Sequence, residues 1–120
     1  MLIAMALAGA MAINSCTHKA PALPPVSFSN DIMPIIQANC SINGTCHVGS
    51  YNDNGHIDLS DSVAYSTITS KGLISISNPT ASLMYSEIQT GYMPKAPYGP
   101  LSANEITLIL QWIQQGAKNN

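Results

Sequence analysis

The chain has 120 residues, which suffices for one domain, and only 8% of them are charged, giving a formal net charge of −2. All four cations are lysines, so no basic patch is available to neutralise a phosphate backbone, and we expect no nucleic-acid partner. The scarcity of charge also excludes a charged ring that would steer docking, so any partner must meet a mostly neutral surface.

The first fifteen residues are uncharged and nearly all small or apolar. They are too short to cross a bilayer as a mature helix, but they suit the apolar region of a secretion signal. The segment INSC at 13–16 resembles a bacterial lipobox, in which a small residue precedes the cysteine that is lipidated. We therefore expect residues 1–15 to be a lipoprotein-type signal peptide and Cys16 to carry the lipid. The alternative is that Cys16 is an ordinary cysteine in a flexible arm.

Residues 16–27 contain three prolines, at Pro21, Pro24 and Pro25. This composition predicts a semi-extended tether, with a rise of about 3 Å per residue where it is polyproline-like. Its expected role is to hold the folded domain, residues 28–120, away from a membrane surface.

The first helix is predicted to begin at a cap formed by Ser29 or Asn30 and to end at Cys40. Its apolar positions are Ile32, Ile35 and Ile36. Residues 41–60 are rich in Gly, Asn, Ser and Asp without periodicity, which predicts a loop. Within it, 58–60 are expected to serve turn and helix-cap chemistry.

Two further short helices are predicted in the middle of the chain. The first covers residues 61–69 and is ended by Gly72, and an extended connection at 73–77 follows it. The second has Pro79 in its first turn and is ended by Gly91. The inward positions are Val63, Ala64, Tyr65 and Ile68 in the first helix and Leu83, Met84 and Ile88 in the second.

The last helix has the clearest sequence signals. Ser102 and Glu105 form a capping box, Trp112 is the only tryptophan, and Gly116 supplies the stop. Apolar residues recur at helical spacing at Ile106, Ile109, Leu110 and Ile113. The fold class expected from these elements is all-α.

A cysteine, a second cysteine and a histidine fall together after the first helix, at Cys40, Cys46 and His47. A Cys-His pair with another cysteine upstream is typical of covalent haem c attachment, in which two thiols bond the porphyrin and the imidazole binds iron. The usual spacing is C-x2-C-H, whereas this chain has C-x5-C-H. If Cys16 carries a lipid, Cys40 and Cys46 form a pair with a shared role.

A haem fixed by His47 needs a ligand on its other face, and Met93 is the best candidate. Met33 and Met84 lie on amphipathic helices, where a thioether more often fills the core. Met93 instead lies in a loop stiffened by Pro94 and Pro97, which can hold one side chain over an open coordination position. Thioether ligation favours ferrous iron and suits electron transfer.

The order of these features resembles a known family. The chain reads D-I-x-P-I-I, then N-C…C-H, G-x-I-D-L-S, N-P-x-x-S-L-M-Y, Y-M-P, and finally L-S-x-x-E-I…W-I-x-x-G-A-x-N-N. This resembles the small monohaem cytochrome c domains of Bacteroidetes-type lipoproteins, which are themselves similar to class I cytochromes c. The resemblance covers about residues 28–120, and in that family the cysteine spacing before Cys-His is often longer than two.

The resemblance implies a cytochrome c-like fold of three to five short helices with long loops around one haem. Cys40 and Cys46 would be the thioether sites, His47 the proximal iron ligand and Met93 the distal one. The first and last helices would cross and pack, with Trp112 near that contact or near the haem edge. The implied function is a membrane-tethered single-electron carrier of the cell envelope, on the periplasmic face or outer membrane, with redox proteins of the respiratory chain or an envelope oxidoreductase as partners.

Three alternatives remain beside this interpretation. Cys40 and Cys46 can form a disulfide in a helical binding or adhesion module that needs no haem. A zinc site can use Cys40, Cys46, His47 or His56, although adjacent ligands at 46 and 47 would point apart. An enzyme is the least favoured, since one Cys-His pair with a ready thioether leaves no open iron position.

Overall fold

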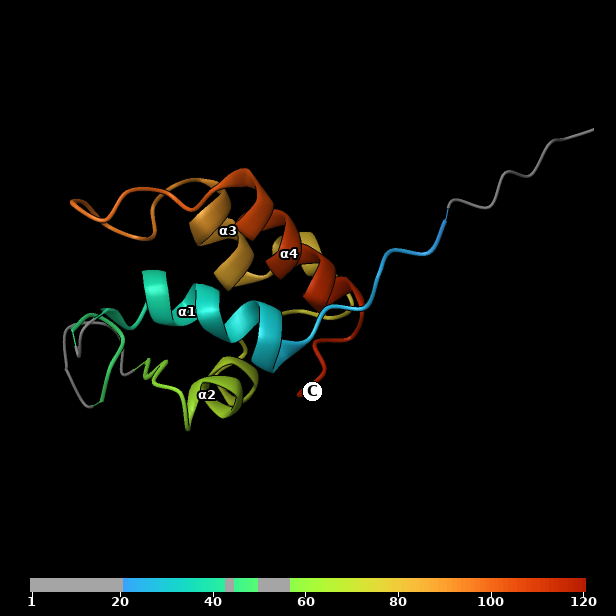
Figure 1. The fold of residues 1–120 in the computed structure, drawn as a ribbon, viewed down its shortest axis with the longest axis horizontal. Coiled ribbons are helices and arrows are strands. Elements are labelled where there is room, and N and C mark those ends of the chain that lie inside the picture. The colour runs from blue at the N-terminus through green and yellow to red at the C-terminus, as the bar shows by residue number, and fades with distance from the viewer. Residues whose placement is uncertain (1–20, 43–44, 50–56) are drawn as a thin grey trace, which may run out of the picture.

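The structure of the chain is a computed structural model that describes residues 21–42, 45–49 and 57–120. Within these ranges the chain forms helices and connecting loops and no strands, which confirms the all-α expectation. The expected signal peptide, Cys16 and His56 lie outside the described residues, as do parts of the predicted 41–60 loop. The described helices are η1 (Phe28–Ile32), α1 (Met33–Asn39), α2 (Ala64–Ser70), η4 (Pro79–Ala81), α3 (Leu83–Gln89) and α4 (Ala103–Gln114) (Figure 1).

The first helix starts earlier than predicted. Its cap is Ser27, whose backbone is extended and whose hydroxyl accepts from Asn30 N at 3.2 Å, so the predicted caps at Ser29 and Asn30 were wrong. The Asp31 carboxylate in turn accepts from Ser27 N at 2.7 Å, and this reciprocal pair explains why Ser27 is chosen. A π-helical turn, η1, then leads directly into α1, with Pro34 in the first turn of α1, where its missing amide costs little.

The helix predicted from Pro79 to Gly91 is divided into two pieces. Pro79 opens the short turn η4, and α3 begins only after Ser82, whose backbone is extended. Ser82 is buried, and its hydroxyl accepts from Ser75 N at 2.9 Å, so the break anchors the preceding 73–77 connection. The interruption leaves Leu83 on the outside with 52% of its surface exposed, contrary to the prediction that it faces inward.

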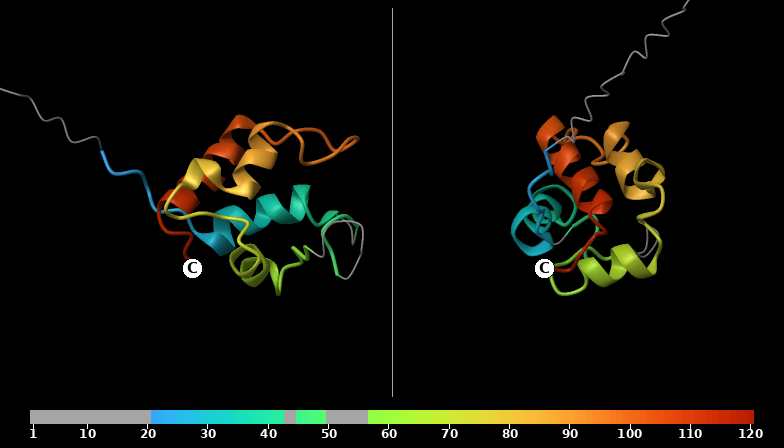
Figure 2. Two further views of the ribbon diagram at one scale, coloured as in Figure 1. Left: turned by 180° about the vertical axis from the view of Figure 1, so that it is seen from behind. Right: turned by 90° about the vertical axis from the view of Figure 1, so that its right-hand side faces the viewer.

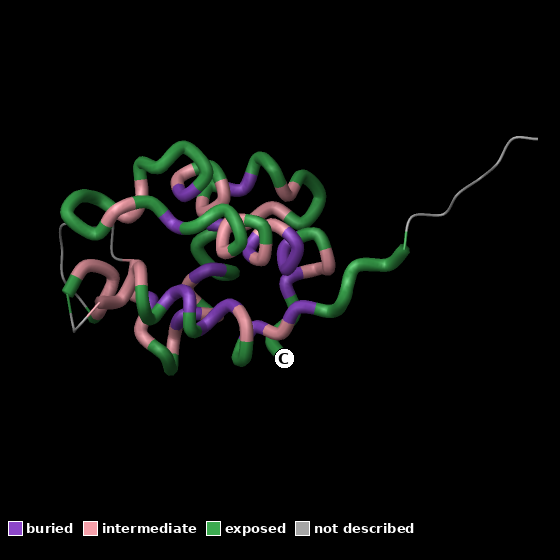
Figure 3. The backbone as a smooth tube through the Cα atoms, turned by 45° about the horizontal axis from the view of Figure 1, so that its top comes forward, coloured by how far each residue is buried: buried purple, intermediate pink, exposed green. Residues whose placement is uncertain are grey.

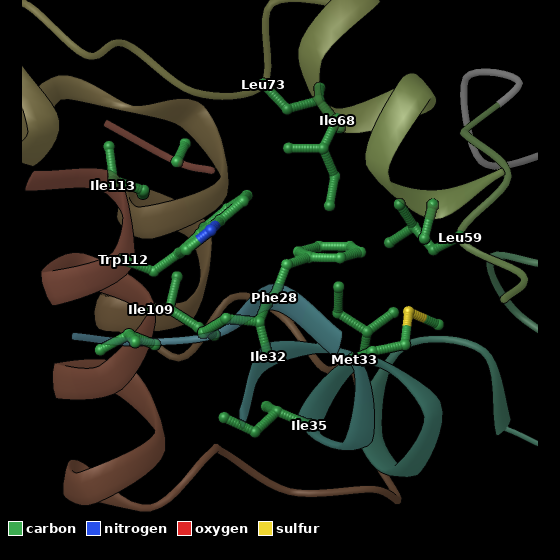
Figure 4. Packing of buried hydrophobic residues seen from close by; sticks show 14 of the residues in the cluster. Phe28, Ile32, Met33, Ile35, Leu59, Ile68, Leu73, Ile109, Trp112 and Ile113 are labelled. Carbon is green, nitrogen blue, oxygen red and sulfur yellow. The ribbon is translucent and has the colours of Figure 1, made fainter. Parts of the chain in front are cut away.

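The C-terminal helix α4 confirms its predicted capping box. The Ser102 hydroxyl accepts from Glu105 N, and the Glu105 carboxylate accepts from Ser102 N at 2.8 Å. The buried residues of α4 include Ile109, Trp112 and Ile113, which face the core on one side of the helix (Figure 4).

The core lies where the first helix crosses α4. Trp112 is completely buried there, and its ring centroid lies 5.3 Å from that of Phe28 (Figure 4). Phe28 also meets Tyr65 edge-on, with their ring centroids 5.2 Å apart. The expected contact between the first and last helices, with Trp112 at it, is therefore confirmed, and it is made mainly through η1. The buried residues run through the middle of the molecule from both helices (Figure 3).

The first helix and α4 run side by side in opposite directions, which gives the domain two distinct ends. At one end Asn120 O accepts from Ser29 N at 2.9 Å, so the chain's C-terminus lies beside the start of η1. At the other end the Asn39 amide donates to Glu105 at 3.3 Å, so the end of α1 lies beside the start of α4. The loops that follow α1 and α3 extend from this second end, opposite the C-terminus (Figures 1 and 2).

Candidate functional site

Two adjoining cavities lie at the second end of the domain, between the two layers of helices. The larger has a volume of about 300 Å³ and the smaller about 120 Å³. Both are bordered by Cys40, His47 and Met93, and the smaller one also by Cys46. The four residues proposed from the sequence as haem-binding therefore all border the smaller cavity, where Met93 joins three residues that are close together in the chain.

The cavities have two walls of different origin. One wall comes from the end of α1 and the segments that hold His47 and Leu59. The other wall comes from α3 and the following loop with Met93. Most of the lining is apolar, and the aliphatic side chains of the larger cavity are Ile57, Leu59, Leu73, Leu83 and Ile88. The arrangement thus offers an imidazole from one wall and a thioether from the other.

The long cysteine spacing is accommodated by a closed loop. His47 N donates to Cys40 O at 3.1 Å, and inside this loop Thr45 N donates to Ile42 O at 2.8 Å. Cys46 occupies the left-handed region with φ of 60°, next to the point where the loop closes. The bond between His47 N and Cys40 O therefore keeps these two residues adjacent despite the long cysteine spacing.

Cys40 is a partly buried thiol at the end of α1. Burial, followed by the neighbouring Cys46 and Glu105, raises its pKa to about 11 from the model-compound value of 9.0. The thiol is therefore protonated at neutral pH. A neutral, partly desolvated thiol is also a group that can be placed against an apolar ligand without the cost of burying a charge.

His47 is fixed in orientation by the segment that follows the loop. Its Nδ1 lies 3.2 Å from Ile57 O, and its carbonyl accepts from Leu59 N at 2.7 Å. A carbonyl can only accept, so we assign the proton to Nδ1, which leaves the Nε2 lone pair for a metal. The fixed tautomer is the one that an iron-binding histidine needs.

The turn that carries Ile57 is itself stabilised by a side chain. Asp58 Oδ1 accepts from Ser60 N at 2.9 Å and from Ser60 Oγ at 2.6 Å, which confirms the predicted turn chemistry. These bonds, with a weaker contribution from Gly49 N, lower the pKa of Asp58. The bonds between Asp58 and Ser60 thus stabilise the turn whose Ile57 carbonyl holds the His47 ring.

Met93 lies on the other wall, in the loop after α3. Its amide donates to Glu87 O at 3.0 Å, so the loop begins from a position fixed by the helix. The peptide bonds Met93–Pro94 and Ala96–Pro97 are cis. Lys95 lies with its Nζ 5.3 Å from the centre of the Tyr92 ring, at the rim of the larger cavity.

The sequence reasoning missed several lining residues. Met84 was assigned to the core, but it borders the larger cavity as a second thioether. Asn39 and Lys95 border both cavities, and Glu87 borders the larger one. No local signal marks these residues, because helical periodicity shows which face is buried and not whether that face meets a cavity or a neighbouring side chain.

The residues present fit a haem of the c type. The larger cavity falls at the lower end of the range of about 300–1,000 Å³ that is usual for ligand sites, and its lining is apolar, as a flat conjugated ring requires. Two thiols, an imidazole and a thioether border the smaller cavity. By contrast, the described residues contain no cluster of three or more Cys, His, Asp or Glu side chains suited to a metal ion such as zinc.

No protein-family model, curated protein or solved structure matches this chain. In the part of the chain that the structure describes, every helix is too short or too polar to cross a membrane.

Proposed function

We propose that this protein is a membrane-tethered c-type cytochrome with one covalently attached haem, which carries single electrons in the cell envelope. The observation that supports this most directly is the shared cavity region bordered by Cys40, Cys46, His47 and Met93. The fold brings the Met93 thioether, which is 46 positions beyond His47 in the chain, to the same cavity as the local group of two thiols and an imidazole. The all-α architecture is compatible with a cytochrome c-like fold.

Each residue has a defined role in this proposal. The Cys40 and Cys46 thiols would hold the haem through two thioether bonds, each formed by adding the S–H bond across a vinyl group of the porphyrin, so that no external oxidant would be needed. His47 binds the iron through Nε2 while Nδ1 is held by Ile57 O. Met93 binds from the other wall. When bound, the haem supplies a one-electron couple, and the apolar lining and thioether favour its reduced state.

Met93 is preferred over Met84 as the distal ligand because of where each borders the region. Met93 borders both cavities, including the smaller one that contains Cys46, whereas Met84 borders only the larger cavity. Met84 also starts from a helix whose position is set by core packing, with its amide donating to Leu73 O at 2.9 Å. We therefore assign Met84 to the apolar wall.

The proposed setting is the envelope, with residues 1–15 removed and Cys16 lipidated, and the proposed partners are redox proteins. We do not expect catalysis by this domain. Filling both axial positions with His47 and Met93 leaves the iron no open position for a substrate.

The decisive experiment is to produce the chain with a c-type maturation system and record its pyridine haemochrome spectrum and intact mass. We expect one covalent haem, retained after denaturation. Cys46→Ser should lose at least one thioether, whereas Cys16→Ser, the matched control, should keep both. A colourless protein with a mass two hydrogens below that of the reduced chain would instead support the disulfide module.

The distal ligand is tested by comparing Met93→Ala with Met84→Ala. We expect only the first to lose the far-red charge-transfer band of methionine-bound ferric iron and to become high-spin. If Met84→Ala loses this band and Met93→Ala keeps it, the assignment of Met93 is wrong while the haem proposal stands.

A further inference from the structure

The last residues of the predicted tether are fixed to the folded domain. Pro24 O accepts two hydrogen bonds, from Gln111 Nε2 at 2.6 Å and from Gln115 Nε2 at 2.8 Å. Gln115 Oε1 then accepts from Val26 N at 2.8 Å, and the Val26 side chain is buried in the core. We call these four residues the tether clamp. The ordered chain therefore begins before the Phe28 boundary expected from sequence.

In the tether clamp, side-chain amides are paired with backbone groups of the tether. Gln111 is one of two buried polar side chains in the described residues, with 9% of its surface exposed. A buried amide must be paired, and its donor is used here to hold Pro24 O. Pro25 lacks an amide hydrogen, so Val26 N is the next donor available, and Gln115 accepts from it. The segment is thus held by one side chain of α4, Gln111, and by its C-cap, Gln115.

The tether clamp lies at the end of the domain opposite the cavities. It engages the last turn of α4, beside Ser27 and Ser29, which bond to Asn120 O. The cavities lie at the other end of the first helix, where Asn39 meets Glu105. In Figures 1 and 2 the chain enters at one end, next to the C-terminus, and the cavity-bearing loops extend from the other.

We propose, resting on the haem and lipid anchor of the proposed function, that the tether clamp makes the cavity rim face away from the bilayer. The haem would then exchange electrons with a protein on the aqueous side and not with a quinol dissolved in the lipid. The clamp leaves the seven residues 17–23 between Cys16 and Pro24, so the two Cα atoms are about 27 Å apart at most when the chain is extended. Without the clamp the free segment would extend to Phe28, with a reach of about 41 Å and no fixed exit direction.

The side chains around the cavity rim are consistent with a protein partner. Leu83 and Tyr92 border the larger cavity and Tyr98 the smaller one, and their exposed fractions are 52%, 60% and 50%. Tyrosine is enriched in protein–protein interfaces, where its ring supplies contact area and its hydroxyl tolerates water. This agrees with a partner that docks on a mostly neutral surface.

The test uses the full-length lipidated holoprotein on vesicles whose headgroups carry a fluorescent donor that the haem quenches. The clamp variant is Gln111→Leu/Gln115→Leu, which keeps side-chain volume and removes both amides. Gln114→Leu, on the exposed side of the same helix, is the control. The pyridine haemochrome is recorded first, and exchange of the Val26 amide hydrogen reports clamp opening independently of the haem.

We expect weak donor quenching in the native protein and in Gln114→Leu, and clearly stronger quenching in the clamp variant. Exchange at Val26 should be roughly tenfold faster in the clamp variant, as loss of about one hydrogen bond predicts. Strong quenching in the native protein, or unchanged quenching despite faster Val26 exchange, would overturn the proposed orientation. Unchanged Val26 exchange would show that the amides do not hold the tether. Absence of haem would refute the proposed function and leave the Val26 result as the test of the clamp.

Discussion

Replacing Glu105 by alanine should destabilise the domain at the end that carries the cavities. The Glu105 carboxylate accepts from Ser102 N at 2.8 Å, from Ser102 Oγ at 2.7 Å and from the Asn39 amide at 3.3 Å. It therefore completes the cap of α4 and also joins α4 to the end of α1, next to Cys40. Few single side chains in the domain connect a helix start to the cavity wall in this way.

The expected magnitude follows from these bonds. Loss of a capping interaction costs about 1 kcal/mol, and loss of the bond to Asn39 adds about 0.5–1 kcal/mol. We therefore expect the free energy of unfolding to fall by about 1–2 kcal/mol at pH 7, and Tm by about 5–10 °C for a domain of this size. Urea unfolding followed by far-UV circular dichroism measures the change. Asp61→Ala, which removes an exposed carboxylate ahead of α2, is the matched control and should have little effect.

The same prediction has a pH signature. The bonds from Ser102, first its hydroxyl and then its backbone, lower the pKa of Glu105 from its ordinary value of 4.5. The contribution of the charged carboxylate is therefore present above about pH 4.5 and is lost as the pH falls through the lowered pKa. The difference in unfolding free energy between the native protein and Glu105→Ala should narrow as the pH falls below about 4.5. This reasoning would be refuted if the two proteins differed in free energy of unfolding by less than about 0.3 kcal/mol at pH 7, or if that difference increased in acid.

Three further predictions concern the core, the thiol and the turn before Met93. Trp112→Ala should lower the unfolding free energy by about 3–5 kcal/mol in urea melts because the ring is fully buried, and a loss below 1 kcal/mol would contradict the packing. In haem-free protein at pH 8, iodoacetamide should alkylate Cys40 about 100-fold more slowly than in the unfolded chain, because burial raises the pKa of the thiol to about 11. Peptide mass spectrometry measures both rates, and equal rates would contradict this prediction. Gly91→Ala should lower the free energy of unfolding by about 1 kcal/mol in thermal melts, because Gly91 has a φ of +74°, which is unfavourable for alanine. Ala96→Gly, the control in the same loop, should change it little.

The parts of the fold that could be predicted depend on signals close together in sequence. The capping box of Ser102 and Glu105 lies within one turn, and the periodicity that buries Ile109 and Ile113 is contained in α4 itself. The grouping of Cys40, Cys46 and His47 is also local. Such signals need no knowledge of the rest of the chain, and the structure agrees with them.

The parts that could not be predicted depend on partners far apart in sequence. Pro24 and Gln111 are separated by 87 positions, and neither residue type signals the other. Ser82 interrupts a periodic helix because its hydroxyl accepts from Ser75 N, and this turned Leu83 outward. Ser27, Ser29 and Asn30 offer the same capping chemistry in sequence, and only the bonds of Ser27 with Asn30 N and with the Asp31 carboxylate identify Ser27 as the cap.

The number of residues between two cysteines does not by itself show whether they can serve the same binding site. Between Cys40 and Cys46 the chain carries three more residues than the usual haem-binding loop, yet the bond from His47 N to Cys40 O closes that loop at its base. What a porphyrin edge requires is two thiols and an imidazole held at one place, and a closed loop can hold them whatever its length. The two ends of the loop are held in place, Cys40 by the end of α1 and His47 by its ring contact with Ile57 O. By this reasoning the longer spacing is compatible with attachment at both thiols.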